Sequence, residues 1–347
     1  MLAQGNPDIS RRDREILRAI IQDFITTGEP VGSQAIAPRC DVSSATVRSA
    51  MADLEELGYL AKPHTSAGRI PTDKGFRLYV DSLLRTRAPG PKERERIEAG
   101  LHAALGADLV ADTGKLLHEI THHAALVVAP HFEQDLLRRV EFVKLREDRI
   151  LAVFVSQAGL VQNRLITVDF PVGRAELEYA ANYLNDKLGD LGLEQIHARL
   201  RAEREAEQAL YDRLHRSAMQ LADAAFADHA APEPEVRVEG EASFLDEPAF
   251  AADVEKMRKL FAALAQKDRV LHVMRRVMEG REIRIFIGAE SEFSEVPGLS
   301  VIAAPYTQGE KVLGALAVVG PVRMNYGRVI PLVQYTARAV SKTFGEG

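Results

Sequence analysis

The chain has 347 residues, a net charge of −6, one cysteine and 46% hydrophobic residues. This length fits two or three domains, the single cysteine excludes an internal disulfide or a Cys-rich zinc site, and no apolar run reaches the ~20 residues of a membrane helix. The polar, charged N-terminus does not fit a signal peptide, so we expect a cytoplasmic protein without a membrane partner.

Charge is unevenly distributed along the chain. Residues 1–87 hold 12 Lys and Arg against 11 Asp and Glu, a net charge of +1, whereas the remainder holds 32 against 39, a net charge of −7. Residues 58–77 contain four basic side chains and one acidic side chain. A local positive patch of this kind favours contact with nucleic acid.

The first predicted helix begins after Ser10. Ser10 and Asp13 fit an N-terminal cap, and apolar residues then recur at helical spacing as far as Ile25. Gly28 and Pro30 end the helix. An amphipathic helix of this kind does not by itself indicate a function.

A short helix, a turn and a longer helix follow. The short helix begins at about Ser33 and is ended by Pro38 and the residues after it, and the longer one covers SSATVRSAMADLEELG, with Gly58 as its C-terminal cap. This order is typical of a helix-turn-helix, whose second helix presents its N-terminal residues to the major groove of DNA. Acidic residues from Asp53 onward would be repelled by phosphates, so the C-terminal half of this helix should point away from DNA.

The candidate DNA contacts on the second helix are the hydroxyl and guanidinium groups of its first turns. They are Ser43, Ser44, Thr46, Arg48 and Ser49. Arg48 either binds a guanine edge with two hydrogen bonds or contacts a phosphate, and the sequence leaves both readings open.

A small basic hairpin is predicted directly after this helix. GYLA and GRIP read as two strands around the loop KPHTSAG, in which Gly68 suits a turn that needs a positive φ. A hairpin in this place can contact the DNA backbone or the minor groove. The predicted phosphate donors are Lys62, His64, Thr65, Ser66 and Arg69. His64 is equally explained as a solvated loop histidine.

A closing helix capped by Thr72 extends to Leu84, and the linker RTRAPGPKERER places the first domain boundary near residue 88. From about residue 115 the pattern mixes strands and helices. Strands are predicted at 124–130, 137–145, 149–157, 160–170, 236–240, 283–288, 300–306 and 311–320, and helices at 176–189, 198–229, 248–278 and 329–344. Strands that are interrupted by a helical block and then resume suggest one α+β domain with a helical insertion.

His118, Glu119 and His122 match the H-E-x-x-H pattern of zinc proteases. A strand follows almost at once, and nothing marks a third ligand, so we expect a structural helix and no metal. Cys40 has no evident histidine partner, and no G-x-S-x-G or phosphate-binding loop is present. We therefore expect neither an enzyme nor a cofactor.

Two long stretches resemble the HrcA family, the heat-inducible transcription repressors of bacteria. They are SSATVRSAMADLEELGYLAKPHTSAGRIPTDKGFRLYVDSLL and GALAVVGPVRMNYGRVIPLVQYTARAV, and NYLNDKLGDLGLEQI between them is also similar. The family commonly has Pro, Ile and Asn where this chain has Ser44, Val47 and Ser49. The last exchange matters most, because an asparagine amide binds adenine with two hydrogen bonds and a serine does not.

The resemblance implies an α+β multidomain protein. We expect a winged helix-turn-helix at 1–88, a linker helix region at 89–114, a GAF-like domain at 115–173 and 236–347, and an inserted helical dimerisation region at 174–235. The resemblance further implies a homodimer that binds double-stranded DNA at an inverted-repeat operator called CIRCE. Such a dimer represses chaperonin and DnaK-type chaperone operons, is relieved by heat and is modulated by a GroEL-type chaperonin. The alternative is a regulator whose DNA affinity is set by a small-molecule effector in the GAF-like domain.

Overall fold

A computed structural model describes residues 9–63, 68–104, 109–129, 137–156, 161–170, 172–188, 220–221, 225, 236–291, 293 and 295–345. The protein mixes helices with antiparallel sheets and divides into two compact units. The first unit is Met1–Val128, Val236–Tyr306 and Ala315–Ala339, and the second is Ala129–Glu235, Thr307–Gly314 and Val340–Gly347.

The first unit begins with helices and a small hairpin. These elements are α1 (Arg11–Thr27), α2 (Ser33–Cys40), α3 (Ser44–Glu56), β1 (Leu60–Ala61), β2 (Ile70–Pro71), α4 (Asp73–Leu78) and the π-helical turn η1 (Tyr79–Leu83). The predicted start and end of the first helix are confirmed, because the Ser10 side chain accepts the Asp13 amide and Gly28 ends α1 with φ 72°. The second helix includes Pro38 and continues to Cys40.

The apolar stripes of α1, α2 and α3 meet in one small core. Its buried members include Ile16, Leu17, Ile20, Ile21, Ile36, Val47, Met51 and Leu54. Burial of a large aliphatic side chain contributes roughly 1.5–3 kcal/mol. This core therefore fixes α3 against the other two helices and leaves its opposite face to solvent.

The hairpin is short, and its second strand pairs with the segment between α1 and α2. β1 and β2 are antiparallel, and Val31 forms a further antiparallel bridge with Arg69. Gly68 has no positive φ, so that expectation is wrong. Glycine is required there for another reason, because a Cβ on Gly68 would lie 2.8 Å from the backbone carbon and oxygen of Pro30.

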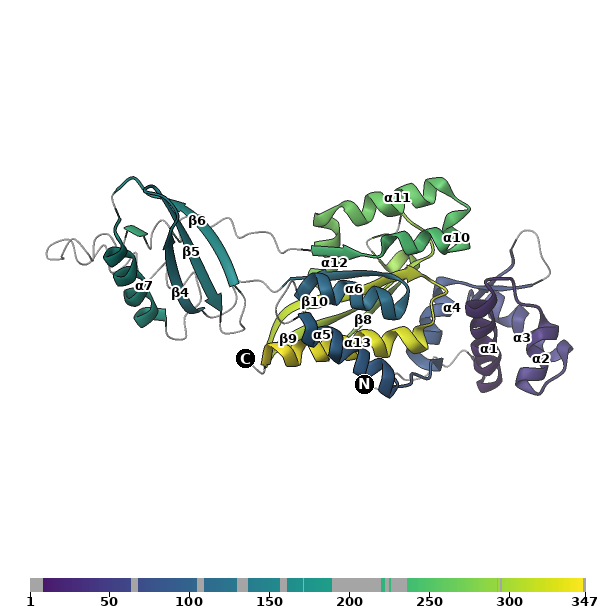
Figure 1. The fold of residues 1–347 in the computed structure, drawn as a ribbon. Helices are drawn as coiled ribbons and strands as arrows, with labels where there is room; N and C mark the ends of the chain where they lie inside the picture. The colour runs from purple at the N-terminus through teal and green to yellow at the C-terminus, as the bar shows by residue number, and fades with distance from the viewer. Residues whose placement is uncertain are drawn as a thin grey trace. The chain divides into compact units, whose positions relative to one another are not determined.

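The rest of the first unit, which we call the body, is built on a five-stranded sheet in the order β7–β3–β10–β9–β8. Its strands are β3 (Ala124–Val128), β7 (Val236–Glu239), β8 (Arg284–Ile287), β9 (Leu299–Gln308) and β10 (Lys311–Pro321). Its helices and helical turns are α5 (Pro91–Ala104), α6 (Leu109–Thr121), η3 (Glu241–Asp246), α10 (Pro248–Ala251), α11 (Val254–Ala265), α12 (Lys267–Met278), η4 (Gly288–Glu290) and α13 (Tyr326–Gly345). Figure 1 shows α11 and α12 on one face of the sheet and α5, α6 and α13 on the other.

The body's main core lies between the sheet and α10–α12. It contains Leu126, Val301 and Ala317 from the sheet, together with Phe250 and Met274 from the helices. The helix predicted at 248–278 is divided into three, because Asp253 caps a new helix and the backbone turns again at Gln266.

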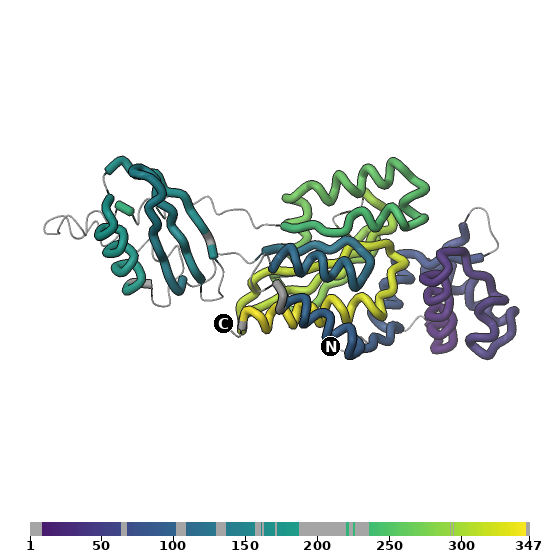
Figure 2. Tube along the Cα trace, viewed as in Figure 1, coloured from purple at the N-terminus to yellow at the C-terminus, as the bar shows by residue number. Residues whose placement is uncertain are grey.

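The second unit contains a separate three-stranded sheet, β4 (Leu137–Lys144), β5 (Arg149–Ser156) and β6 (Val161–Thr167), with α7 (Arg174–Leu188) along it. Figure 2 shows the trace of α7 beside these strands. Alternate strand residues such as Val140, Ala152 and Ile166 are buried with Ala180 and Leu184 of the helix.

This second sheet changes the domain boundary expected from the sequence. The family resemblance implies that the strands at 137–170 belong to the GAF-like domain and that the insertion begins at 174. In the structure these strands pair with one another and share a core with α7, so the second unit begins at Ala129. The helix predicted at 198–229 lies almost entirely outside the described residues.

Candidate nucleic-acid interface

The turn between α2 and α3 is held by contacts within it. Asp41 ends α2 in the left-handed conformation, with φ 53°, which aspartate tolerates better than most residues. The hydroxyl oxygens of Ser33 and Ser44, the first residues of the two helices, lie 2.9 Å apart. Ser44, a predicted DNA contact, is therefore half-buried and joined to α2.

Ser43 and Thr46 form the N-terminal cap of α3. The Ser43 Oγ accepts the Thr46 amide at 3.1 Å and lies 2.8 Å from the Thr46 Oγ1. An N-cap of this type satisfies an amide that has no partner within the helix. Both residues thus fix the first turn of α3, whatever else they contact.

The N-terminal part of the exposed face of α3 is formed by Ala45, Arg48, Ser49 and Ala52, and the acidic Asp53 and Glu56 continue it toward the C-terminal end. These positions recur at helical spacing and lie opposite the buried stripe. Within the described part of the chain, Arg48 and Ser49 have neither an ion pair nor a side-chain hydrogen bond. Sequence reasoning missed Ala45 and Ala52 because they carry no polar group, although their spacing with Arg48 was a usable signal.

Three of the four basic residues at 58–77 are bound within the protein. The Arg69 Nε donates to Glu55 Oε2 at 2.6 Å, with 19% of the Arg69 side chain exposed. The Lys74 Nζ donates to the carbonyl oxygen of Leu57 at 2.8 Å, and Arg77 pairs with the distant Glu290. Two of the four charges of the predicted positive patch, those of Arg69 and Arg77, are therefore neutralised by internal carboxylates, and a third, that of Lys74, is bound to the end of α3.

The other DNA contacts predicted for the hairpin lie only in part within the described residues. Lys62, the fourth basic residue, is exposed beside the hairpin. His64, Thr65 and Ser66 lie outside the described residues. Among the predicted contacts that the structure describes, the exposed ones are Ser43, which caps α3, and Arg48, Ser49 and Lys62, whereas Ser44, Thr46 and Arg69 are half-buried.

The C-terminal end of α3 has the predicted glycine cap. Gly58 adopts φ 76°, its amide donates to the Glu55 carbonyl at 2.9 Å, and the Tyr59 amide donates to the Leu54 carbonyl at 2.9 Å. This pair of bonds is a Schellman motif, which satisfies the last carbonyls of a helix. It sets the direction in which the chain leaves α3 toward the hairpin.

The H-E-x-x-H segment has no metal-binding geometry. α6 ends before His122, which adopts φ 59°, and His118 Nδ1 lies 3.0 Å from the His123 carbonyl oxygen. Glu119 pairs with Arg96 at 2.8 Å. Burial and the neighbouring imidazoles lower the pKa of His123 to about 4, so this ring is neutral near pH 7. Among the described residues, no group of three or more His, Cys, Asp or Glu is placed to hold a metal.

Comparison with known proteins identifies the family. A family model described as the HrcA protein C-terminal domain matches residues 107–330. The heat-inducible transcription repressor HrcA of Anaeromyxobacter sp. (strain K) is 51% identical over 342 residues, covering 96% of both chains. The chain belongs to the HrcA family of heat-inducible transcription repressors.

A second relative agrees with this assignment, and a solved structure shares the fold. The HrcA of Geobacter sulfurreducens is 45% identical over 340 residues, covering 96% of this chain and 98% of the relative. A crystal structure of a hypothetical protein is similar in fold, with a TM-score of 0.64 and 22% identity over 97% of this chain and 99% of that one. None of the helices in the described ranges is both long and apolar enough to span a membrane.

Replacing Lys62 by methionine should weaken DNA binding, whereas the same replacement of Arg69 should lower the stability of the protein. Lys62→Met should weaken binding to all DNA sequences and reduce the slope of log affinity against log salt by about 0.9, the value for one lost phosphate contact. Arg69→Met should instead lower the unfolding midpoint, because it leaves Glu55 unpaired at the hairpin. Salt titrations of DNA binding and thermal unfolding distinguish the two. A larger change in salt slope for Arg69→Met, with an unchanged midpoint, would make Arg69 the phosphate donor.

Proposed function

We propose that residues 9–84 form a winged helix-turn-helix that binds a CIRCE-type inverted repeat, one half-site for each subunit of a dimer. The observation that carries this proposal is the exposed face of α3, where Arg48 and Ser49 stand between Ala45 and Ala52. Two small methyl groups allow the helix backbone to approach the floor of the major groove, and alanine methyls contact thymine methyl groups there. Acidic Asp53 is exposed further along the helix, which favours insertion of the N-terminal half.

The hairpin acts as the wing in this proposal. Lys62 donates to DNA phosphates, as the sequence also predicts for His64, Thr65 and Ser66, and Arg69 supports the hairpin through Glu55. Because phosphate contacts position a protein without reading its sequence, the wing supplies affinity and α3 supplies specificity. Bound in this way the dimer occludes the promoter of chaperonin and DnaK-type chaperone operons, and heat releases it. A GroEL-type chaperonin promotes the active state, and the protein acts in the cytoplasm.

The five-stranded body is the GAF-like domain in this proposal. The dimer interface lies on the second unit. On the face of the β4–β5–β6 sheet away from its core, Val143, Leu151 and Leu165 lie side by side across the three strands. Val143 is 46% exposed and Leu165 is 51% exposed, and Val161 on the same face is 61% exposed. An apolar sheet face of this kind favours association with an identical face on a second copy.

Arg48→Ala should reduce binding to a CIRCE-type repeat about tenfold or more, because a good base contact discriminates by about 1–3 kcal/mol. Gel-shift titration against the repeat and a scrambled duplex measures this. Arg338→Ala, which removes the same charge from an exposed position on α13, is the matched control and should change neither affinity. Equal losses on both duplexes would make Arg48 a phosphate contact, and no preference of the unaltered protein for the repeat would contradict the proposed function.

Leu165→Asp should convert the dimer to a monomer, because it places a charge in the apolar row. Val254→Asp, which places the same charge at an 82% exposed apolar position on α11, outside the second unit, should leave the dimer intact. Sedimentation velocity at micromolar concentration measures both. A Leu165→Asp protein that remains dimeric would exclude this sheet face as the interface.

A second candidate function, regulation by a small effector, is favoured by a cavity of about 670 Å³ beside the body. Its walls include Ile25 and Tyr79. Arg85, Arg87 and Arg328 also line it, against Glu93, which pairs with Arg328 at 3.3 Å. Cavities of this size hold small ligands, and the excess of positive charge favours an anionic one. Thermal shift assays with ATP and with inorganic phosphate test it: an increase in the unfolding midpoint that Arg85→Ala abolishes supports an effector, and no shift argues against it.

A further inference from the structure

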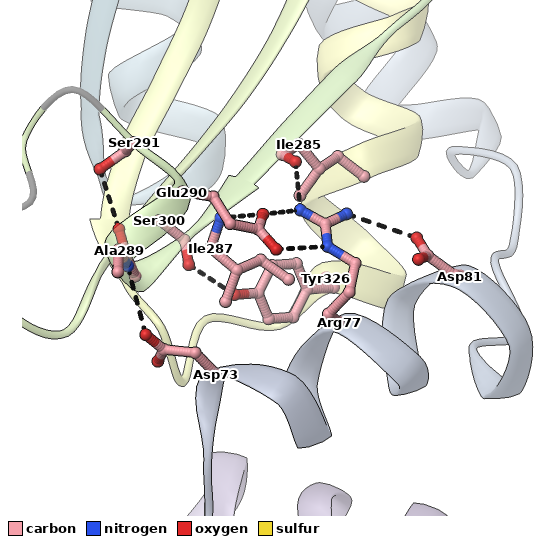
Figure 3. A network of polar contacts seen from close by, with 11 residues as sticks. Asp73, Arg77, Asp81, Ile285, Ile287, Ala289, Glu290, Ser291, Ser300 and Tyr326 are labelled. Atoms are coloured by element: carbon pink, nitrogen blue, oxygen red, sulfur yellow. Dashed lines mark hydrogen bonds and ion pairs between the residues drawn. The ribbon is translucent and has the colours of Figure 1, made fainter. Parts of the chain in front are cut away.

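An arginine on α4, the helix that closes the N-terminal segment, binds this helix to the body. Arg77 on α4 donates through Nε to Glu290 Oε1 at 2.9 Å and through Nη2 to the other carboxylate oxygen of Glu290. Nη2 also donates to the Ile285 carbonyl at 2.6 Å, and Nη1 donates to Asp81 Oδ1 at 3.3 Å. Figure 3 shows this guanidinium between α4 and the end of β8. A planar guanidinium bound at two edges fixes orientation as well as distance.

The body holds Glu290 ready for this contact. Its Oε2 accepts the Ile287 amide at 3.1 Å, so the carboxylate is fixed against its own turn, η4. In the same turn the Ala289 amide donates to Asp73 Oδ2 at 3.2 Å. Gly288 adopts φ 54°, and a Cβ there would lie 1.8 Å from that Asp73 oxygen, so only glycine allows the approach. We call Asp73, Arg77, Gly288 and Glu290 the joint.

The charges of the joint are stable near neutral pH. Burial opposes ionisation of Glu290, but the hydrogen bonds from Arg77 and the Ile287 amide outweigh it and lower the pKa of the carboxyl. Burial likewise opposes the charge on Arg77, and Glu290 and Asp81 outweigh it and raise the pKa of the guanidinium. Both groups are therefore ionised under ordinary conditions.

The joint is connected through α4 to the C-terminal end of α3. At the C-terminal end of α3, the Thr72 Oγ1 donates to the Gly58 carbonyl at 2.7 Å and the Lys74 Nζ to the Leu57 carbonyl at 2.8 Å. A Cβ on Gly75 would lie 2.3 Å from the Tyr59 carbonyl oxygen, so α4 packs directly on the chain that leaves α3. One end of α4 thus holds α3 while Arg77 holds the body.

Aromatic side chains run parallel to this polar path. The ring of Phe76 on α4 lies 6.3 Å from that of Phe24 on α1 and 6.1 Å from that of Tyr326 on α13. The Tyr326 hydroxyl lies 2.7 Å from the Ser300 hydroxyl on β9, and both groups are buried. α1, α4, α13 and the sheet are therefore in continuous contact.

We propose that the joint is a specificity determinant: it sets the orientation of α3 on the body and hence the spacing between half-sites that the dimer accepts. Arg77 and Glu290 are positioning residues, which act through α4 and do not touch DNA. Half-site spacing follows from the separation of two reading helices in a dimer. The side chains of Arg77 and Glu290 are 29% and 42% exposed, and ion pairs so exposed contribute little to stability. The inference rests on the proposed function, since it requires two half-sites.

The test compares Glu290→Gln with a matched control, Glu295→Gln. Glu295 pairs with Arg269 through both carboxylate oxygens, at side-chain exposures of 38% and 29%, away from α4. The probes are the full inverted repeat, the same repeat with one base pair added to or removed from its spacer, and a single half-site. Glu290→Gln should lose about tenfold in affinity for the full repeat, keep its half-site affinity within about twofold, and discriminate less between spacers.

A second variant tests the proposal if Glu290→Gln does not fold. Arg77→Lys keeps the charge but cannot bind both carboxylate oxygens and the Ile285 carbonyl at once, and it should relax spacer discrimination in the same way. The inference is overturned if both folded variants behave like Glu295→Gln, or if half-site and full-site affinities fall together. If the unaltered protein binds the full repeat no more tightly than a single half-site, the proposed function is wrong, and the inference about the joint falls with it.

Discussion

The ion pair between Arg77 and Glu290 is the contact on which the rest of the arrangement depends. Local sequence builds α3, its caps and the hairpin, but none of these fixes where α3 faces relative to the body. That direction is transmitted by α4, which packs on the Tyr59 carbonyl through Gly75 and reaches the body through Arg77. A short helix bound at both ends, with a glycine at each close approach, allows little rotation. The proposed DNA-reading face of α3 is thus oriented by residues that lie away from that face.

The distribution of charge has a related consequence. The basic residues at 58–77 suggested a patch for phosphates, yet Arg69, Lys74 and Arg77 bond to Glu55, Leu57 and Glu290. Their charges stabilise the hairpin, the end of α3 and the joint. What is left for DNA is a limited set of exposed side chains, which fits a protein that depends on specific contacts and on two half-sites more than on general attraction.

Much of the local structure was predictable because its causes lie within a few residues. Ser10 and Thr72 cap their helices, Gly58 ends α3, and alternating apolar residues locate the strands. The failures concern partners distant in sequence. Nothing near Gly68 shows that Pro30 approaches it, nothing near Arg77 points to Glu290 more than 200 residues away, and strand patterns do not say which sheet a strand joins. The separate β4–β5–β6 sheet was missed for that last reason.

The distance between α3 and the body tests the joint most directly. Cysteines introduced at the exposed positions Ala52 and Lys259, with the single native Cys40 replaced by serine, accept a pair of spin labels. Pulsed electron resonance on labelled chains diluted with unlabelled protein then measures the distance within one subunit. A single narrow distribution that becomes broad in Glu290→Gln, but not in Glu295→Gln, is the predicted result. An equally narrow distribution in all three proteins would contradict the role of the joint.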